Sequence, residues 1–97
     1  MAHYTLDHLL DYLREGWVKS STSPYATAEQ KVAGALKGTL LKYYNDHGLA
    51  AFRDYVTDYN RTLHSLHQSP STSPDVKEAV IYEIPTTEVV LSRLRLL

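Results

Sequence analysis

The hydrophobic positions between residues 49 and 66 follow the pattern of a helix that buries one narrow stripe. They recur at alternating spacings of three and four residues: Leu49, Phe52, Val56, Tyr59, Leu63 and Leu66. Because this alternation keeps the side chains on one side of an α-helix, it predicts a helix whose apolar seam packs against other helices. The rest of the chain must supply the helices that cover this seam.

A first helix is expected from about Thr5 to Trp17. Its leucines and the tryptophan share one face, while its acidic residues take the other side. Thr5 suits the N-cap position, because its hydroxyl can accept a hydrogen bond from a backbone N–H of the first turn. The following segment, Lys-Ser-Ser-Thr-Ser-Pro at residues 19–24, is expected to break the helix.

The second predicted helix has two possible starting points. Ser23 and Pro24 read as N-cap and first helical residue, whereas Thr27 with a glutamine three residues later forms a capping box. The helix extends to about Asp46, and Gly48 ends it as a C′ glycine. Because the connection is so short, the second and third helices are predicted to form an antiparallel hairpin.

The sequence Ser-Thr-Ser-Pro occurs twice, at residues 21–24 and again at 71–74. Both copies are expected to do the same local work of capping and starting a helix. The residues that flank them do not align well enough to indicate an internal duplication.

The last quarter of the chain leaves more than one interpretation open. Residues 76–84 have the spacing of a short helix, but residues 80–84 could equally be a strand. Pro85 is expected to stop either one. Residues 88–97 are predicted to form a closing helix, and the alternative is a hairpin that turns at residues 85–87.

The predicted fold is therefore a single all-α domain over residues 1–97. It is a small four- to five-helix bundle with an antiparallel central helical hairpin.

Two glycines within the second predicted helix need an explanation. Gly34 and Gly38 lie four residues apart, opposite the apolar face, and each costs about 1 kcal/mol relative to alanine. A close approach of another backbone, from protein or nucleic acid, would account for them. Together with Leu41 they are the predicted partner interface.

Composition excludes some classes of chemistry. The chain has no cysteine, so disulfides, thiolate catalysis and cysteine metal sites are excluded. The pairs His64 with His67 and His8 with Asp11 lack a third ligand at a recognisable spacing, so no metal or cofactor is expected. Catalytic motifs are absent, and an enzyme is not predicted.

Nucleic-acid contact is the sharpest functional hypothesis from the residues themselves. Arg53 and Asn60 belong to a stripe of donors beside the apolar seam, and Lys31 and Lys42 border the glycine face. With Arg61, they could follow a phosphate backbone without reading sequence. The alternative for the same residues is a solvated face, with Arg61 in an ordinary ion pair three residues from an aspartate. The formal net charge of −1 argues against a strongly basic arm.

The N-terminal residues have neither the basic nor the apolar region of a signal peptide, and no apolar run approaches the length needed to span a bilayer. A cytoplasmic protein without membrane contact is therefore expected.

The stretch from Leu40 to Phe52, and within it His47-Gly48-Leu49-Ala50-Ala51-Phe52, resembles the small-subunit family of CRISPR effector complexes. These are short helical bundles in which a helix ends at an Asn/His-Gly-Leu turn and the next carries an Ala/Phe pattern. The resemblance implies a non-catalytic subunit of antiviral defence, stacked in several copies along a guide-containing complex and contacting a strand through basic residues. Such subunits tend to be basic, whereas this chain is near neutral.

Two functional hypotheses follow. The first is a non-enzymatic subunit of a larger protein or nucleoprotein assembly that contains several copies and contacts nucleic-acid backbone. The alternative is a free-standing dimeric interaction protein or an immunity-type inhibitor that binds a protein partner.

Overall fold

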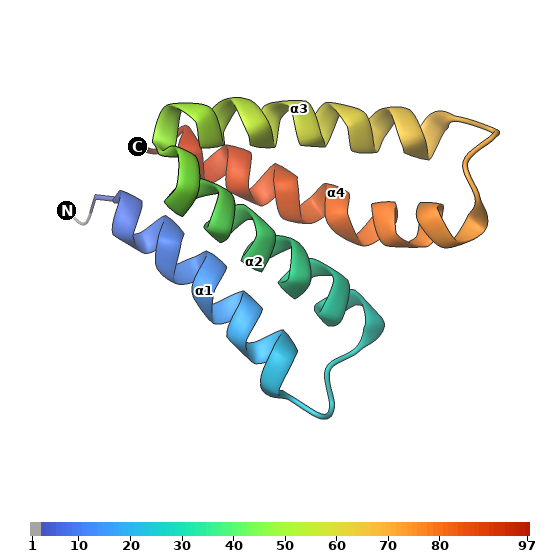
Figure 1. Cartoon of the computed structure of the whole chain (residues 1–97), viewed down its shortest axis with the longest axis horizontal. Helices are drawn as coiled ribbons and strands as arrows, with labels where there is room; N and C mark the ends of the chain where they lie inside the picture. The colour runs from blue at the N-terminus through green and yellow to red at the C-terminus, as the bar shows by residue number, and fades with distance from the viewer. Residues whose placement is uncertain (1–2) are drawn as a thin grey trace.

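The computed structural model describes residues 3–97 and folds them into four α-helices (Figure 1). These residues contain no strand, so the prediction of a small all-α bundle is confirmed. The helices are α1 (Leu6–Thr22), α2 (Ala28–His47), α3 (Leu49–Gln68) and α4 (Pro74–Leu94).

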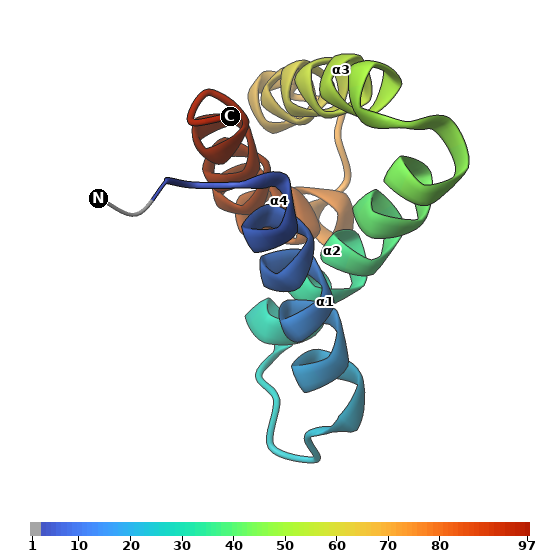
Figure 2. The ribbon, with the colours of Figure 1, turned by 90° about the vertical axis from the view of Figure 1, so that its left-hand side faces the viewer.

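The helices are arranged as two hairpins that meet at one corner. Helices α1 and α2 pair closely along their length, as do α3 and α4, and we call these the first and second hairpins. Gly48 alone joins α2 to α3, and its φ of 86° lies in the left-handed region that favours glycine. From this corner the hairpins diverge, so that their connecting loops lie far apart (Figure 1). The turned view in Figure 2 shows the same separation of α3 from the loop between α1 and α2.

The local sequence accounts for where the first two helices begin. The Thr5 hydroxyl accepts a hydrogen bond from the His8 backbone N–H, and the His8 ring accepts one from the Thr5 N–H. Thr27 and Gln30 form the same reciprocal arrangement at the start of α2. The capping-box start is therefore confirmed, and the alternative start at Ser23 is wrong.

The two copies of Ser-Thr-Ser-Pro play different roles, so the expectation of a shared role is wrong. In the second copy Ser73 caps α4, and Pro74 is its first residue. In the first copy, Ser21 and Thr22 still belong to α1, and their hydroxyls donate to backbone carbonyls three or four residues earlier. The first copy therefore lies at the end of α1. Hydroxyl groups can form such short-range hydrogen bonds with the backbone at either end of a helix.

Helix α4 continues through Pro85, so the prediction that this proline stops the element is wrong. The C-terminal quarter is one helix and not a hairpin. Pro85 is exposed, and so is Ile81, whose carbonyl Pro85 leaves without its usual helical donor. Val80 and Val90, which lie before and after Pro85 in α4, are buried. Their packing outweighs the tendency of proline to break a helix.

Two hydroxyls next to Pro85 add support within the helix. The Thr86 hydroxyl donates to the Tyr82 carbonyl oxygen at 3.2 Å. The Thr87 hydroxyl lies 2.9 Å from the Ile84 carbonyl oxygen and 3.3 Å from that of Glu83. Both threonines are buried. Their hydroxyls bond to backbone carbonyls in the turn where Pro85 interrupts the helical hydrogen bonds.

The main core lies near the corner and draws on all four helices. The predicted seam of α3 supplies Phe52 and Val56, which are fully buried, while Leu63 further along is nearly so. Leu49, Tyr59 and Leu66 are only half-buried. The other buried hydrophobic residues are Leu9, Leu13, Leu36, Leu40, Leu41, Val80, Val90 and Leu94.

No helix within residues 3–97 combines the length and the apolar character needed to cross a membrane.

Candidate interaction surface

The glycines of α2 face α1 of the same chain. A side chain at Gly34 would collide with Ser20 and would come within 2.9 Å of the Gly16 carbonyl oxygen, and one at Gly38 would meet the Trp17 ring at 2.6 Å. The predicted close approach of a second backbone therefore exists, but α1 makes it. Ridges of neighbouring helices can approach this closely only where small residues meet.

The three residues predicted for a partner interface are thus used inside the first hairpin. Gly34 and Leu41 are buried, and Gly38 is half-buried beneath Trp17. A larger side chain at Gly38 would disturb the chain itself, so its effect on association could not be separated from its effect on folding.

Four of the five residues predicted to contact nucleic acid have exposed side chains, and Arg61 is the one of them that forms an ion pair. Lys31 and Lys42 are exposed on one face of α2, because eleven residues return a helix to nearly the same direction. Arg53 is exposed on α3. None of the ion pairs formed within residues 3–97 involves these three cations.

Asn60 and Arg61 are engaged within the chain. The Asn60 amide nitrogen donates to the Thr87 hydroxyl oxygen at 2.9 Å, in the half-buried contact between α3 and α4. The Arg61 guanidinium lies 3.5 Å from the Asp58 carboxylate, so the ordinary ion pair that was the alternative for it is present. Of the predicted donor stripe on α3, Arg53 is thus exposed, whereas Asn60 is engaged with α4.

The paired histidines likewise have ordinary roles. His64 lies 3.1 Å from the Glu88 carboxylate on α4, and the His8 ring belongs to the cap of α1. Within residues 3–97, histidine, aspartate and glutamate side chains form no group of three or more that could hold a metal ion.

A largely apolar groove of about 660 Å³ runs between α3 and α4, in the half of the second hairpin that is remote from the corner. We call it the α3–α4 groove. Its apolar lining includes Leu63 and Leu66 of α3 and Val76, Ala79 and Val80 of α4.

The groove exists because the two hairpins diverge. Tyr55 and Tyr59 line it, and Tyr55 also stacks on Tyr43 of α2, with ring centroids 4.0 Å apart. The groove therefore lies on the side of the second hairpin that α2 covers near the corner. All of its lining residues come from α3 and α4. With distance from the corner, α2 turns away from α3 (Figure 1).

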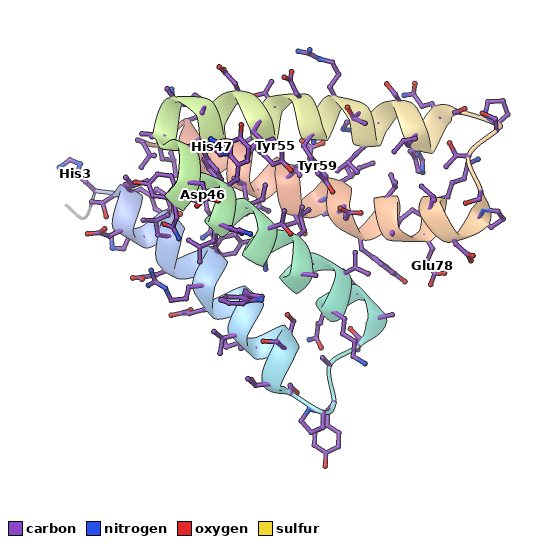
Figure 3. The ribbon with its side chains drawn as sticks, in the orientation of Figure 1. His3, Asp46, His47, Tyr55, Tyr59 and Glu78 are labelled. Atoms are coloured by element: carbon purple, nitrogen blue, oxygen red, sulfur yellow. The ribbon has the colours of Figure 1, made fainter. Side chains whose placement is uncertain are left out.

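Aromatic side chains lead from the corner into this groove. His47 and Tyr43 lie against one another on α2 with ring centroids 4.3 Å apart, Tyr43 stacks on Tyr55, and Tyr55 lies 5.7 Å from Tyr59. Figure 3 shows His47 at the end of α2, by the corner, and then Tyr55 and Tyr59 further out along α3. Rings arranged in this way offer a broad apolar surface with polar edges.

Three carboxylates border the groove: Asp58 on α3 and Asp75 and Glu83 on α4. The Tyr59 hydroxyl donates to Glu83 at 2.7 Å across the two helices. Burial, followed by this hydrogen bond, raises the pKa of the Tyr59 phenol above its ordinary value of 10.0. The lining, over the described residues 3–97, combines apolar side chains with these carboxylates and contains no basic side chain, although Arg61 outside it lies 3.5 Å from Asp58.

The first hairpin also exposes apolar side chains, but without an apolar groove. Trp17 is 47% exposed, Val18 45% and Tyr25, in its connecting loop, 90%. The hollow between this hairpin and the middle of α4, about 870 Å³, is lined largely by hydroxyl-bearing, charged and small residues.

Sequence reasoning identified the groove residues of α3 but assigned them to the core. Tyr59, Leu63 and Leu66 belong to the predicted seam. The sequence contained one signal for the groove: the seam is longer than the helices that could cover it, so part of it would stay uncovered. The acidic residues across the groove come from α4, and their position depends on the helix continuing through Pro85.

Comparison of the chain with protein-family models, with curated proteins and with solved structures finds no match.

Proposed function

We propose that this chain is a non-enzymatic binding subunit that acts by holding a protein partner. The observation that carries the proposal is the α3–α4 groove, an apolar surface on one face of the second hairpin that α2 leaves uncovered. Val76, in its lining on α4, is 42% exposed. Contiguous apolar surface of this kind on a small domain is typical of an interaction site.

The use of the hydroxyl groups supports a binding role without catalysis. Thr5, Thr27 and Ser73 cap helices. Within the helices, Thr39 and Thr57 donate to backbone carbonyls of the preceding turn. An activated nucleophile would instead need an adjacent, oriented base.

Contact with nucleic acid is a second candidate function, in which the chain belongs to a nucleoprotein assembly. It is favoured by Lys31, Lys42 and Arg53, which are exposed and outside the ion pairs formed within residues 3–97. The implied relation to the small subunits of CRISPR effector complexes stays a prediction.

Native mass is the test of the first proposal. The protein is recovered under mild conditions from cells that express it, and mass and absorbance spectrum are measured across the same chromatographic peak. We expect a mass well above the 11.0 kDa of one chain, with the spectrum of protein alone. A peak at the mass of a single chain would overturn the proposal.

The same measurement tests the second candidate. A nucleic-acid spectrum that disappears with rising salt, and with Lys42→Glu and Arg53→Glu together, would support it, because released counterions make such binding strongly salt-dependent. Arg61→Glu is the matched control, since Arg61 already lies beside Asp58. A spectrum unaffected by the double substitution would overturn it.

A further inference from the structure

We infer that the α3–α4 groove is the seat of an amphipathic helix from a partner protein, with basic residues along the edges of its apolar face. This inference rests on the proposed protein-binding function and names the partner's chemistry. The shape of the seat, its floor and its charge each support it.

The shape of the groove suits a helix. Near the corner, α2 lies on this face of the second hairpin, where Tyr43 stacks on Tyr55 and Tyr44 meets Phe52 edge-on at 5.9 Å. The groove continues the same face outward, between residues 55 and 66 of α3. At 1.5 Å per residue this is about 16 Å, or roughly three helical turns. A helix there would extend the packing that α2 begins.

The floor of the groove offers the contacts that such a helix needs. Leu63 is nearly buried, Leu66 and Ala79 are half-buried, and Val76 is 42% exposed. Ala79 leaves room between the larger side chains for a leucine or similar residue to enter. Helices recognised in grooves typically insert apolar residues at positions i, i+3, i+4 and i+7.

The edges of the groove select the charge of the occupant. Asp58 lies on one side and Asp75 and Glu83 on the other, and no basic side chain is among the lining residues of the described chain. Asp58 already lies 3.5 Å from the Arg61 guanidinium, whereas Asp75 and Glu83 take part in no ion pair within residues 3–97, so an acidic helix would place like charge against them. Lysine or arginine at its edges would complement them, as opposed potentials across interfaces do.

The C-terminal segment of a second copy fits the groove poorly. It combines basic and apolar residues, but Leu94 is buried and the Arg93 guanidinium stacks 3.9 Å from the centre of the Tyr12 ring. Only residues 95–97 extend beyond α4 with exposed side chains. They are too few to fill roughly three turns.

The test uses fluorescence anisotropy with the full chain and a labelled synthetic helix of leucine and lysine, with leucines at helical spacing. Two comparison peptides have the same leucine positions with glutamate for lysine, or the same composition in scrambled order. We expect the leucine–lysine helix to bind and both comparison peptides to bind at least about tenfold more weakly. Equal binding of the glutamate peptide would overturn the assigned charge, and equal binding of the scrambled peptide would overturn the helix.

Two pairs of variants locate the binding. Ala79→Trp fills the groove and should weaken binding by about tenfold or more, whereas Ala35→Trp, on the exposed face of α2, should leave it unchanged. Asp58→Asn should weaken binding about two- to fivefold, whereas Asp54→Asn, one turn away on α3 and outside the groove, should not. Circular dichroism verifies that each variant is folded.

The outcomes separate this inference from the proposed function. If the native complex forms but the leucine–lysine helix does not bind, or binds the Ala79→Trp chain equally well, the inference is wrong and the binding function stands. If Ala79→Trp converts a dimer of this chain into monomers in sedimentation, the groove serves self-association and the inference is also wrong. A chain without any native complex would overturn the function itself.

Discussion

The two hairpins share a topology but are held together in opposite ways. In the first, small residues let the backbones of α1 and α2 approach, with Gly34 facing Ser20 and the Gly16 carbonyl. In the second, hydrogen bonds between side chains join α3 and α4, including those from Asn60 to Thr87 and from Tyr59 to Glu83.

This difference explains where an interaction surface can exist. Close backbone contact leaves little space between α1 and α2, and the exposed apolar residues of that hairpin lie on its outside. The second hairpin carries an open groove between its helices, and the Tyr59–Glu83 hydrogen bond lies in the lining of that groove. The first hairpin should therefore be sensitive to added volume, and the second to the loss of specific hydrogen bonds.

The largest predicted effect is that of added volume in the first hairpin. Gly34→Ala should lower the free energy of unfolding by about 1–3 kcal/mol, although alanine favours a helix by about 1 kcal/mol. Its new methyl group would meet the Ser20 side chain and the Gly16 backbone. Urea unfolding measures the change.

Gly16→Ala is the matched control for this substitution. Its methyl group would meet the Lys37 side chain, which is flexible and can move aside. We expect a smaller loss or a gain in stability. Equal losses for the two variants would show that close backbone contact does not hold the first hairpin together.

A smaller loss of stability is expected from substitutions in the two Ser-Thr-Ser-Pro copies, whose serines have different roles. Ser73→Ala should destabilise the chain by about 1 kcal/mol, because the Ser73 hydroxyl accepts a hydrogen bond from the Val76 N–H at the start of α4. Ser23→Ala, in the other Ser-Thr-Ser-Pro copy, should change the free energy of unfolding by only a few tenths of a kcal/mol, because α2 is capped by Thr27. Thermal or urea unfolding of both variants compares them, and a larger loss for Ser23→Ala would contradict the roles assigned to the two copies.

The smallest effect is a pH dependence in the second hairpin. The pKa of the Tyr59 phenol is raised in the folded chain. The protonated phenol therefore contributes fully to stability below about pH 10, near the pKa of an unfolded tyrosine. This contribution is lost as the pH rises toward the folded pKa. Tyr59→Phe should be about 1 kcal/mol less stable at neutral pH. The difference in the free energy of unfolding between this variant and the original chain should then narrow above about pH 10.

Urea unfolding between about pH 8 and about pH 10.5 checks this dependence. Tyr25→Phe is the control, because the Tyr25 side chain is 90% exposed. A constant gap between Tyr59→Phe and the original chain would show that the Tyr59–Glu83 contact does not respond to pH.

Much of the fold could be predicted because it follows from local patterns. The three-and-four spacing of α3 marked Phe52, Val56 and Leu63, all of which are buried. The capping box at Thr27 and the glycine at Gly48 marked the limits of α2. These signals act within a few residues, so their meaning does not depend on the rest of the chain.

The candidate site could be predicted only in part. The residues chosen for nucleic-acid contact were selected by helical spacing, which does not reveal that Asn60 faces Thr87, twenty-seven residues away. The glycines of α2 correctly indicated a close neighbour, but not that α1 is that neighbour.

The sequence by itself determined the all-α class, most helix limits and the presence of an apolar seam, because periodicity, caps and glycine conformation are properties of neighbouring residues. Tertiary structure decided that α4 runs through Pro85, because burial of Val80 and Val90 on either side outweighs one lost backbone hydrogen bond. It also decided that α2 covers only part of the seam. The angle between helices depends on how side chains from different elements fit together, and this fit left the α3–α4 groove open.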